Sequence, residues 1–139
     1  MKHLKSYQLF ESVKLDYNLI QDIKDILLPL SDIGVEVSCD YLEGGEDISF
    51  NLMTSKEKAF NINDYRSDFD ALISFMKERG WFIWKFSLGV AVKEETWAGF
   101  QLVAKTQNIL STTYRTLIYD VVEDPVFWVS GQFKKGTVK

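Results

Sequence analysis

The sequence predicts a single α+β domain in which an antiparallel sheet is covered on one face by two helices. Three observations support this prediction: two stretches with helical periodicity, several runs that alternate apolar and polar residues, and a glycine-rich turn between two such runs. A helix with one apolar stripe buries it best against the apolar face of a sheet. The simplest arrangement is a two-layer sandwich with a ferredoxin-like or permuted ferredoxin-like topology. The domain is expected to span residues 14–139, after a leader or short docking helix at residues 1–13.

Two amphipathic segments predict the helices. Apolar side chains recur at helical spacing over residues 15–33, and Pro29 should end or kink the last turn because proline lacks an amide N–H. A second helix should begin after a capping residue, either Asn63 or Asp64, whose side-chain oxygen can accept from the free amides of the first turn. Gly80 should close it.

Alternation predicts a hairpin between these helices. Residues 35–41 and residues 48–52 each place apolar side chains at every second position, which is the period of a half-buried strand. The segment 43–46, Glu-Gly-Gly-Glu, has the composition of a turn. The two strands should therefore pair with their apolar residues on one face.

The strongest strand pattern follows the second helix, over residues 82–92. Because large apolar side chains gain about 1.5–3 kcal/mol each on burial, this strand is predicted to be the centre of the sheet. The predicted core face carries Phe82, Trp84, Phe86, Leu88, Val90 and Val92, and the opposite face carries Trp81, Ile83, Lys85 and Ser87.

The C-terminal third is less regular. Residues 97–104 fit neither period well and could form a strand or a helix. Residues 114–122, rich in β-branched and aromatic side chains, predict a strand. A last strand is expected over residues 126–133, followed by a frayed tail at residues 134–139.

Composition argues against several classes of function. The net charge of −4 and the lack of a Lys/Arg cluster argue against nucleic-acid binding. No apolar run approaches the roughly 20 residues that cross a bilayer, so we expect a soluble, cytoplasmic protein without a membrane partner. No glycine-rich phosphate loop occurs, so we expect no cofactor. The single cysteine, Cys39, lies on the predicted core face and is interpreted as a small buried hydrophobe.

The only histidine, His3, lies in the leader, and general acid–base catalysis needs a side chain in a fixed position. Carboxylates are therefore the remaining candidates for catalytic or metal-binding groups. Oxygen-rich turns can hold Ca²⁺ or Mg²⁺, so an enzyme that uses carboxylates or a divalent metal is one hypothesis. A solvated turn is the favoured interpretation, because the spacing matches no EF-hand loop and charged runs usually face water. The weak metal candidates are Asp40, Glu43, Glu46 and Asp47.

The surplus of aromatic residues favours a different hypothesis, a non-enzymatic protein that acts by association and forms a homodimer. Aromatic side chains are enriched at protein interfaces, and the chain holds four Trp, six Tyr and ten Phe. Those outside the predicted core row could pack under the C-terminal segment, form a subunit interface or stack on a ligand. The candidate interface or ligand-platform residues are Trp81, Ile83, Trp97, Phe127 and Trp128.

The first residues carry a resemblance. The chain begins Met-Lys, and residues 6–11 read Ser-Tyr-Gln-Leu-Phe-Glu. This pattern resembles the capsid-targeting leaders of internal head proteins of large tailed phages, which begin Met-Lys, carry a Thr/Ser-Tyr-Gln segment and end at a Leu/Ile-x-Glu site. The resemblance implies a phage or phage-like marine environmental origin, and delivery into a capsid with cleavage after Glu11, the site being Leu9-Phe10-Glu11. The alternative interpretation is a short helix that docks on the domain.

Overall fold

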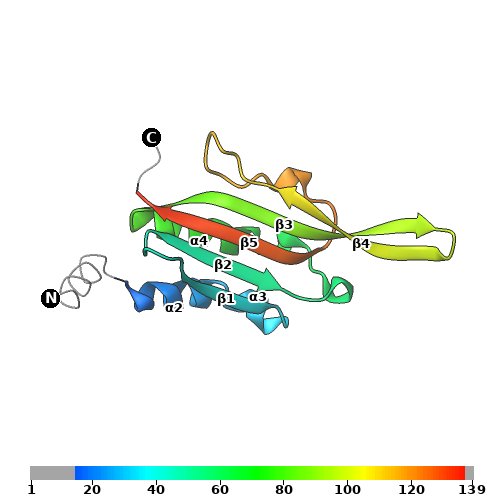
Figure 1. Ribbon diagram of the computed structural model, residues 1–139, viewed down its shortest axis with the longest axis horizontal. Coiled ribbons are helices and arrows are strands. Elements are labelled where there is room, and N and C mark those ends of the chain that lie inside the picture. The colour runs from blue at the N-terminus through cyan, green and yellow to red at the C-terminus, as the bar shows by residue number, and fades with distance from the viewer. Residues whose placement is uncertain (1–14, 137–139) are drawn as a thin grey trace.

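One five-stranded antiparallel sheet organises the computed structural model, which describes residues 15–136 (Figure 1). The strand order is β1-β2-β5-β3-β4. The predicted α+β class is confirmed, whereas a ferredoxin-like topology is not, because β5 lies between the two hairpins β1–β2 and β3–β4. The strands are β1 Glu36–Tyr41, β2 Asp47–Met53, β3 Trp81–Thr96, β4 Gly99–Asn108 and β5 Val126–Lys135.

The helices lie together on one side of the sheet, behind the strands in Figure 1. They are α2 Tyr17–Ile26, α3 Leu28–Asp32 and α4 Arg66–Glu78. The other face of the sheet carries no helix among residues 15–136, and we call it the open face. The apolar core therefore fills the space between the helices and one side of the sheet.

The first predicted helix is divided into two. Asp16 caps α2, with its carboxylate accepting from the amides of Asn18 and Leu19. α2 ends at Ile26 with Leu27 as its C-cap, and Pro29 lies in the first turn of α3, where the missing N–H costs no hydrogen bond.

The second predicted helix starts slightly later than expected. Neither Asn63 nor Asp64 caps α4, because Tyr65 lies at its N-cap and makes no side-chain cap hydrogen bond. Asn61 instead caps the turn before it, where its side chain accepts from the Asn63 amide at 2.9 Å. A 3₁₀ turn over Ile62–Tyr65 then leads into α4. The apolar stripe of α4 is buried as its periodicity predicts, through Phe69, Leu72 and Met76.

A β-bulge changes which side chains of β3 enter the core. The register of β3 against β5 shifts between Ile83 and Lys85, with Trp84 as the extra residue. Because one extra residue reverses the alternation, Trp81 and Ile83 lie in the core and Phe82 does not. The predicted faces are therefore wrong for residues 81–84 and right from Phe86 onwards.

The centre of the sheet is β5, not β3 as predicted, since β5 has two neighbouring strands on each side. Its Gly131 pairs with Phe50 of β2 and with Phe86 of β3. The ring of Phe50 occupies the space above this glycine and packs 5.7 Å from Phe133 and 6.0 Å from Phe86, measured between ring centroids. These rings form the middle of the core.

The segment between β4 and β5 departs most from the prediction. Residues 99–108 form a strand, which settles the open choice for residues 97–104. The strand predicted over residues 114–122 is wrong: only Leu117 makes a bridge, with Leu110, and Tyr119–Val121 forms a 3₁₀ turn. Tyr119 supplies the reason, because its buried hydroxyl donates to Asp70 Oδ1 at 3.0 Å and so binds this segment to α4.

The leader and its proposed processing site, Leu9-Phe10-Glu11, lie outside the described residues, as does the end of the tail. In the described part of the chain, no helix has the length and apolar character that crossing a membrane requires.

We predict that Gly131→Ala destabilises the fold. A methyl group there would lie well inside van der Waals contact with the fully buried Phe50 ring, so the central rings must repack. Overpacking of this kind costs about 1–3 kcal/mol in the free energy of unfolding, measurable by urea denaturation. Ser130→Ala, one residue away on the open face, is the control and should change stability little; equal stability of both variants would contradict the packing described here.

Candidate functional site

The predicted interface residues lie in three separate places. Trp81 and Ile83 are 5% and 1% exposed and belong to the core. Phe127 and Trp128 lie half-buried at the start of β5. Trp97 is fully exposed, at 100%, at the turn between β3 and β4. The structure therefore does not bring the five residues together into one surface.

The open face carries its own group of aromatic side chains. The rings of Trp128 and Phe127 lie against Gly89, so close that a methyl group on Gly89 would be 3.1 Å from Trp128. Trp84, which the bulge turns to this face, lies under two lysines: Lys85 Nζ is 4.3 Å and Lys134 Nζ 5.3 Å from its ring. Sequence reasoning placed Trp84 in the core, because a period-two pattern carries no sign of a bulge.

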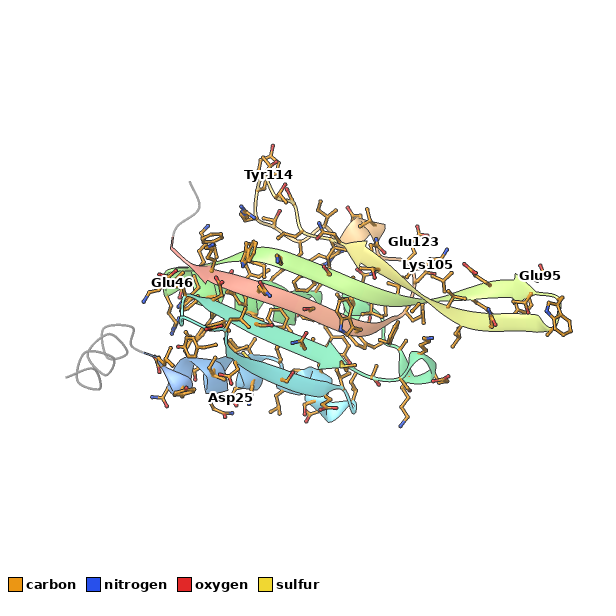
Figure 2. All side chains as sticks on the ribbon, viewed as in Figure 1. Asp25, Glu46, Glu95, Lys105, Tyr114 and Glu123 are labelled. Carbon is orange, nitrogen blue, oxygen red and sulfur yellow. The ribbon has the colours of Figure 1, made fainter. Side chains whose placement is uncertain are left out.

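The β3–β4 hairpin projects beyond the rest of the sheet (Figures 1 and 2). Pairing of β3 with β5 ends at Val90, and the Ala91 amide makes one more bond, to the Pro125 carbonyl at 2.8 Å. Beyond this point β3 pairs only with β4, from Val92↔Val103 to Thr96↔Gly99. We call the two-stranded segment 92–103 the arm.

The arm buries little of its apolar surface. Phe100 is 65% and Leu102 39% exposed, in addition to the fully exposed Trp97 at the tip. Lys93 Nζ lies 4.7 Å from the Phe100 ring, and Lys105 makes a 3.0 Å ion pair with Glu94. Exposed contacts of this kind contribute only about 0–1 kcal/mol each, and an isolated two-stranded ribbon is marginally stable in water. The arm therefore presents apolar groups that its own fold does not cover.

The outer edge of β4 is unpaired in the part of the chain that the structure describes. No backbone hydrogen bond reaches it from residues outside the β3–β4 hairpin over 99–106. Only near its end does another segment approach, where Gln107 Nε2 donates to the Val121 carbonyl at 2.6 Å. Gly99, with φ of +114°, closes the turn at the tip and begins the ten-residue edge strand.

The acidic residues of the β1–β2 turn do not form a metal site within residues 15–136. No three carboxylate, cysteine or histidine side chains there approach one another as metal ligands would, so Asp40, Glu43, Glu46 and Asp47 do not form such a group. Asp47 Oδ1 is buried without a hydrogen-bond donor among the described residues. Elsewhere on the surface, Asp120 makes a 3.7 Å ion pair with Arg66.

Cys39 is buried, as the alternation of β1 predicts. Burial is the main cause that raises the pKa of its thiol, to about 12, with a smaller contribution from the charge of Asp40, while Lys24 acts in the opposite direction. A thiol with such a pKa is not a thiolate nucleophile at neutral pH.

Comparisons with models of protein families, with curated proteins and with solved structures found no match to this chain.

We predict that Cys39 makes the protein less stable in alkali. The unfolded thiol loses its proton near pH 9, whereas the folded thiol keeps it up to about pH 12, so the folded state binds more protons between these values. Between pH 9 and about pH 12, the free energy of unfolding should therefore fall by up to about 1.4 kcal/mol per pH unit. Urea denaturation at pH 8 and pH 10 should show a smaller fall for Cys39→Ala than for the wild type; the same fall in both proteins would contradict the buried position of the thiol.

Proposed function

We propose that this chain acts by protein–protein association rather than by catalysis, and that it forms a homodimer through its β4 strands. The outer edges of two β4 strands would pair antiparallel about a two-fold axis. The observation that carries this proposal is the bare outer edge of β4, which continues into an arm whose apolar side chains are exposed.

The composition of this edge favours pairing. Proteins usually protect an edge strand by making it short or by adding lysines, prolines or a bulge. β4 is ten residues long, and Lys105 is its one charged residue. The other edge of the sheet, β1, is six residues long and carries Glu36 and Asp40, so it is protected in the usual way. The two edges therefore differ in length and in charge, and these two properties decide whether another strand can pair with an edge.

Pairing of two β4 strands is also compatible with their side chains. In an antiparallel pair centred on Val103, Lys105 of each copy lies opposite Gln101 of the other, so like charges do not meet. On the open face, Leu102 lies opposite Ala104 and Phe100 opposite Thr106. The pairing would extend each five-stranded sheet into a continuous one of roughly twice the width.

The same register provides a place for the tip of the arm. Because Gly99 would lie opposite Gln107 of the second copy, Trp97 would reach the segment beyond Gln107, which in each copy adjoins Val121. Val121 is 52% exposed and Ile118 in the same segment is 43% exposed. The dimer would thus cover both the tip and these residues, which the single chain leaves in water.

We predict that Val103→Lys abolishes dimerisation. It places two like charges opposite each other at the two-fold axis, and light scattering after size-exclusion chromatography should show a dimer for the wild type and a monomer for the variant. Ser38→Lys, the same added charge at the exposed β1 edge, should remain a dimer. A monomeric wild type at tens of micromolar would refute the proposal.

A second variant guards against misfolding of Val103→Lys. Trp97 makes no buried contact in the single chain, so Trp97→Ser should leave the thermal unfolding of the monomer unchanged. It should nevertheless weaken the dimer at least tenfold, as measured by sedimentation across a dilution series. A dissociation constant equal to that of the wild type would show that the tip takes no part in association.

A further inference from the structure

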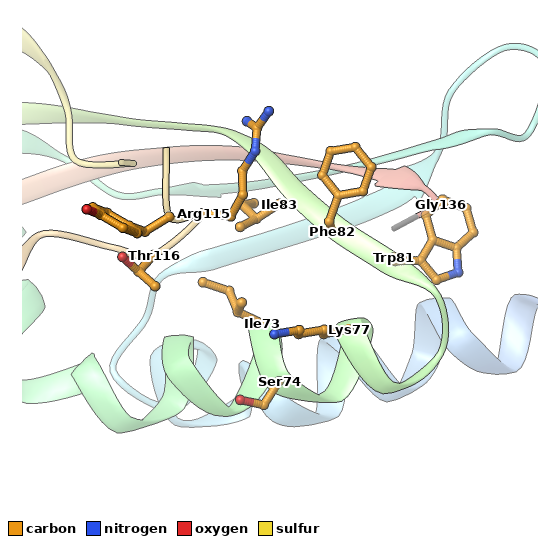
Figure 3. A pocket seen from close by; sticks show the side chains of 10 residues that line it. Ile73, Ser74, Lys77, Trp81, Phe82, Ile83, Arg115, Thr116 and Gly136 are labelled. Atoms are coloured by element: carbon orange, nitrogen blue, oxygen red, sulfur yellow. The ribbon is translucent and has the colours of Figure 1, made fainter. Parts of the chain in front are cut away.

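The opposite end of β3 holds a pocket that the proposed dimer does not use. β4 pairs with β3 only from Ser87 onwards, so the outer edge of Trp81–Phe86 has no strand beside it. A pocket of about 510 Å³ opens there, between β3, α4 and the loop at residues 111–116 (Figure 3). A volume of this size suits a small organic molecule.

The walls of the pocket are apolar. Trp81 and Ile83, which the bulge turns to the helix side, are buried and line the pocket together with Ile73 of α4. Phe82 and the exposed ring of Tyr114 complete the apolar lining. A ligand would therefore bury an aliphatic or aromatic body here.

The polar groups of the pocket are cationic. Lys77 comes from α4 and Arg115 from the facing loop, and none of the described residues that line the pocket is acidic. Within residues 15–136 neither cation makes an ion pair with a carboxylate. The remaining polar lining, the hydroxyls of Ser74 and Thr116, can donate to an anion.

Arg115 shows two independent signs of a built site. It is the one non-glycine residue of the described chain with a positive φ, at 55°, a conformation that costs free energy and that is concentrated at functional sites. The loop holds this conformation by hydrogen bonds from the Arg115 amide to the Ser111 carbonyl and from the Ser111 amide to the Thr116 carbonyl, both 2.8 Å. Its Nε is also buried and has no acceptor among the described residues, whereas buried polar atoms normally have a partner.

We propose that this pocket binds a small anionic amphiphile, a molecule with an apolar body and a carboxylate or phosphate head. The head would accept from Arg115, whose guanidinium carbon lies 5.5 Å from the centre of the Phe82 ring, and the body would lie on Ile73, Trp81 and Ile83. Lys77, whose ammonium lies apart from the Arg115 guanidinium in Figure 3, would add positive potential from the α4 side of the pocket. Planar guanidinium groups suit both heads, because each offers two oxygens to a pair of N–H donors.

The test is calorimetric titration with octanoate, octyl phosphate and octylammonium, which share one apolar chain. We expect saturable binding of at least one of the two anions and none of the cation, and the better anion identifies the head group. The methyl NMR signals of Ile73 and Ile83 should shift during the titration. Absence of saturable anion binding, equal binding of octylammonium, or unmoved isoleucine signals would each overturn the proposal.

Charge-removing variants locate the head group. Arg115→Met, which keeps a non-glycine residue at this φ, should weaken anion binding at least tenfold, and Lys77→Met, at an exposed position of α4, about threefold or more. Arg79→Met removes a cation from the same helix end outside the pocket, and Lys134→Met removes one from the aromatic group of the open face; both should bind as the wild type does. A loss as large in either control would place the anion elsewhere.

This proposal does not depend on the dimer. Val103→Lys changes β4 beside Val92, far along β3 from the pocket, so the variant should bind the anion with unchanged affinity whether or not it dimerises.

Discussion

The offset of β3 between its two neighbours is the constraint on which the rest of this structure depends. β3 has sixteen residues, and it pairs with β5 over Trp81–Val90 and with β4 over Ser87–Thr96. Only Ser87–Val90 has a partner on both sides. Each end of β3 therefore has one unpaired edge, and the two candidate sites of the molecule lie at these two ends. The arm forms where β5 is missing, and the pocket forms where β4 is missing.

The core fixes this offset. Over the doubly paired stretch, Leu88 and Val129 face each other and are both fully buried, and the neighbouring Gly131 accommodates the Phe50 ring. Sliding β5 along β3 by two residues would keep the alternation but would place a side chain where the Phe50 ring now lies. The close fit between a ring and a glycine thus selects one register, and the register in turn determines which edges of β3 stay bare.

Sequence reasoning recovered the elements whose signal is local. The amphipathic stripe of α4 and the alternation of β1 and β2 each follow from contacts with one neighbouring layer, and all three elements appear where the periodicity places them. Sequence reasoning failed where the local structure depends on a contact with residues far away in the chain. The bulge at Trp84 depends on how β3 meets β5, and the path of residues 114–122 depends on the hydrogen bond from Tyr119 to Asp70, forty-nine residues away in the chain. Arg115 had no sequence signal, because its importance arises from the loop that holds it beside β3.

The bulge also explains why association is assigned to the β4 edge and not to the aromatic group of the open face. By turning Trp84 outward, it places that ring beneath Lys85 and Lys134, whose charged ends shield it from a partner. Trp128 and Phe127 likewise lie against Gly89 and are half-buried within the single chain. Trp97 has no such cover, and neither does the backbone edge of β4 that leads to it. The aromatic residues of the open face are therefore largely covered by their own sheet, whereas the arm would gain both hydrogen bonds and buried apolar surface from the second strand that we propose.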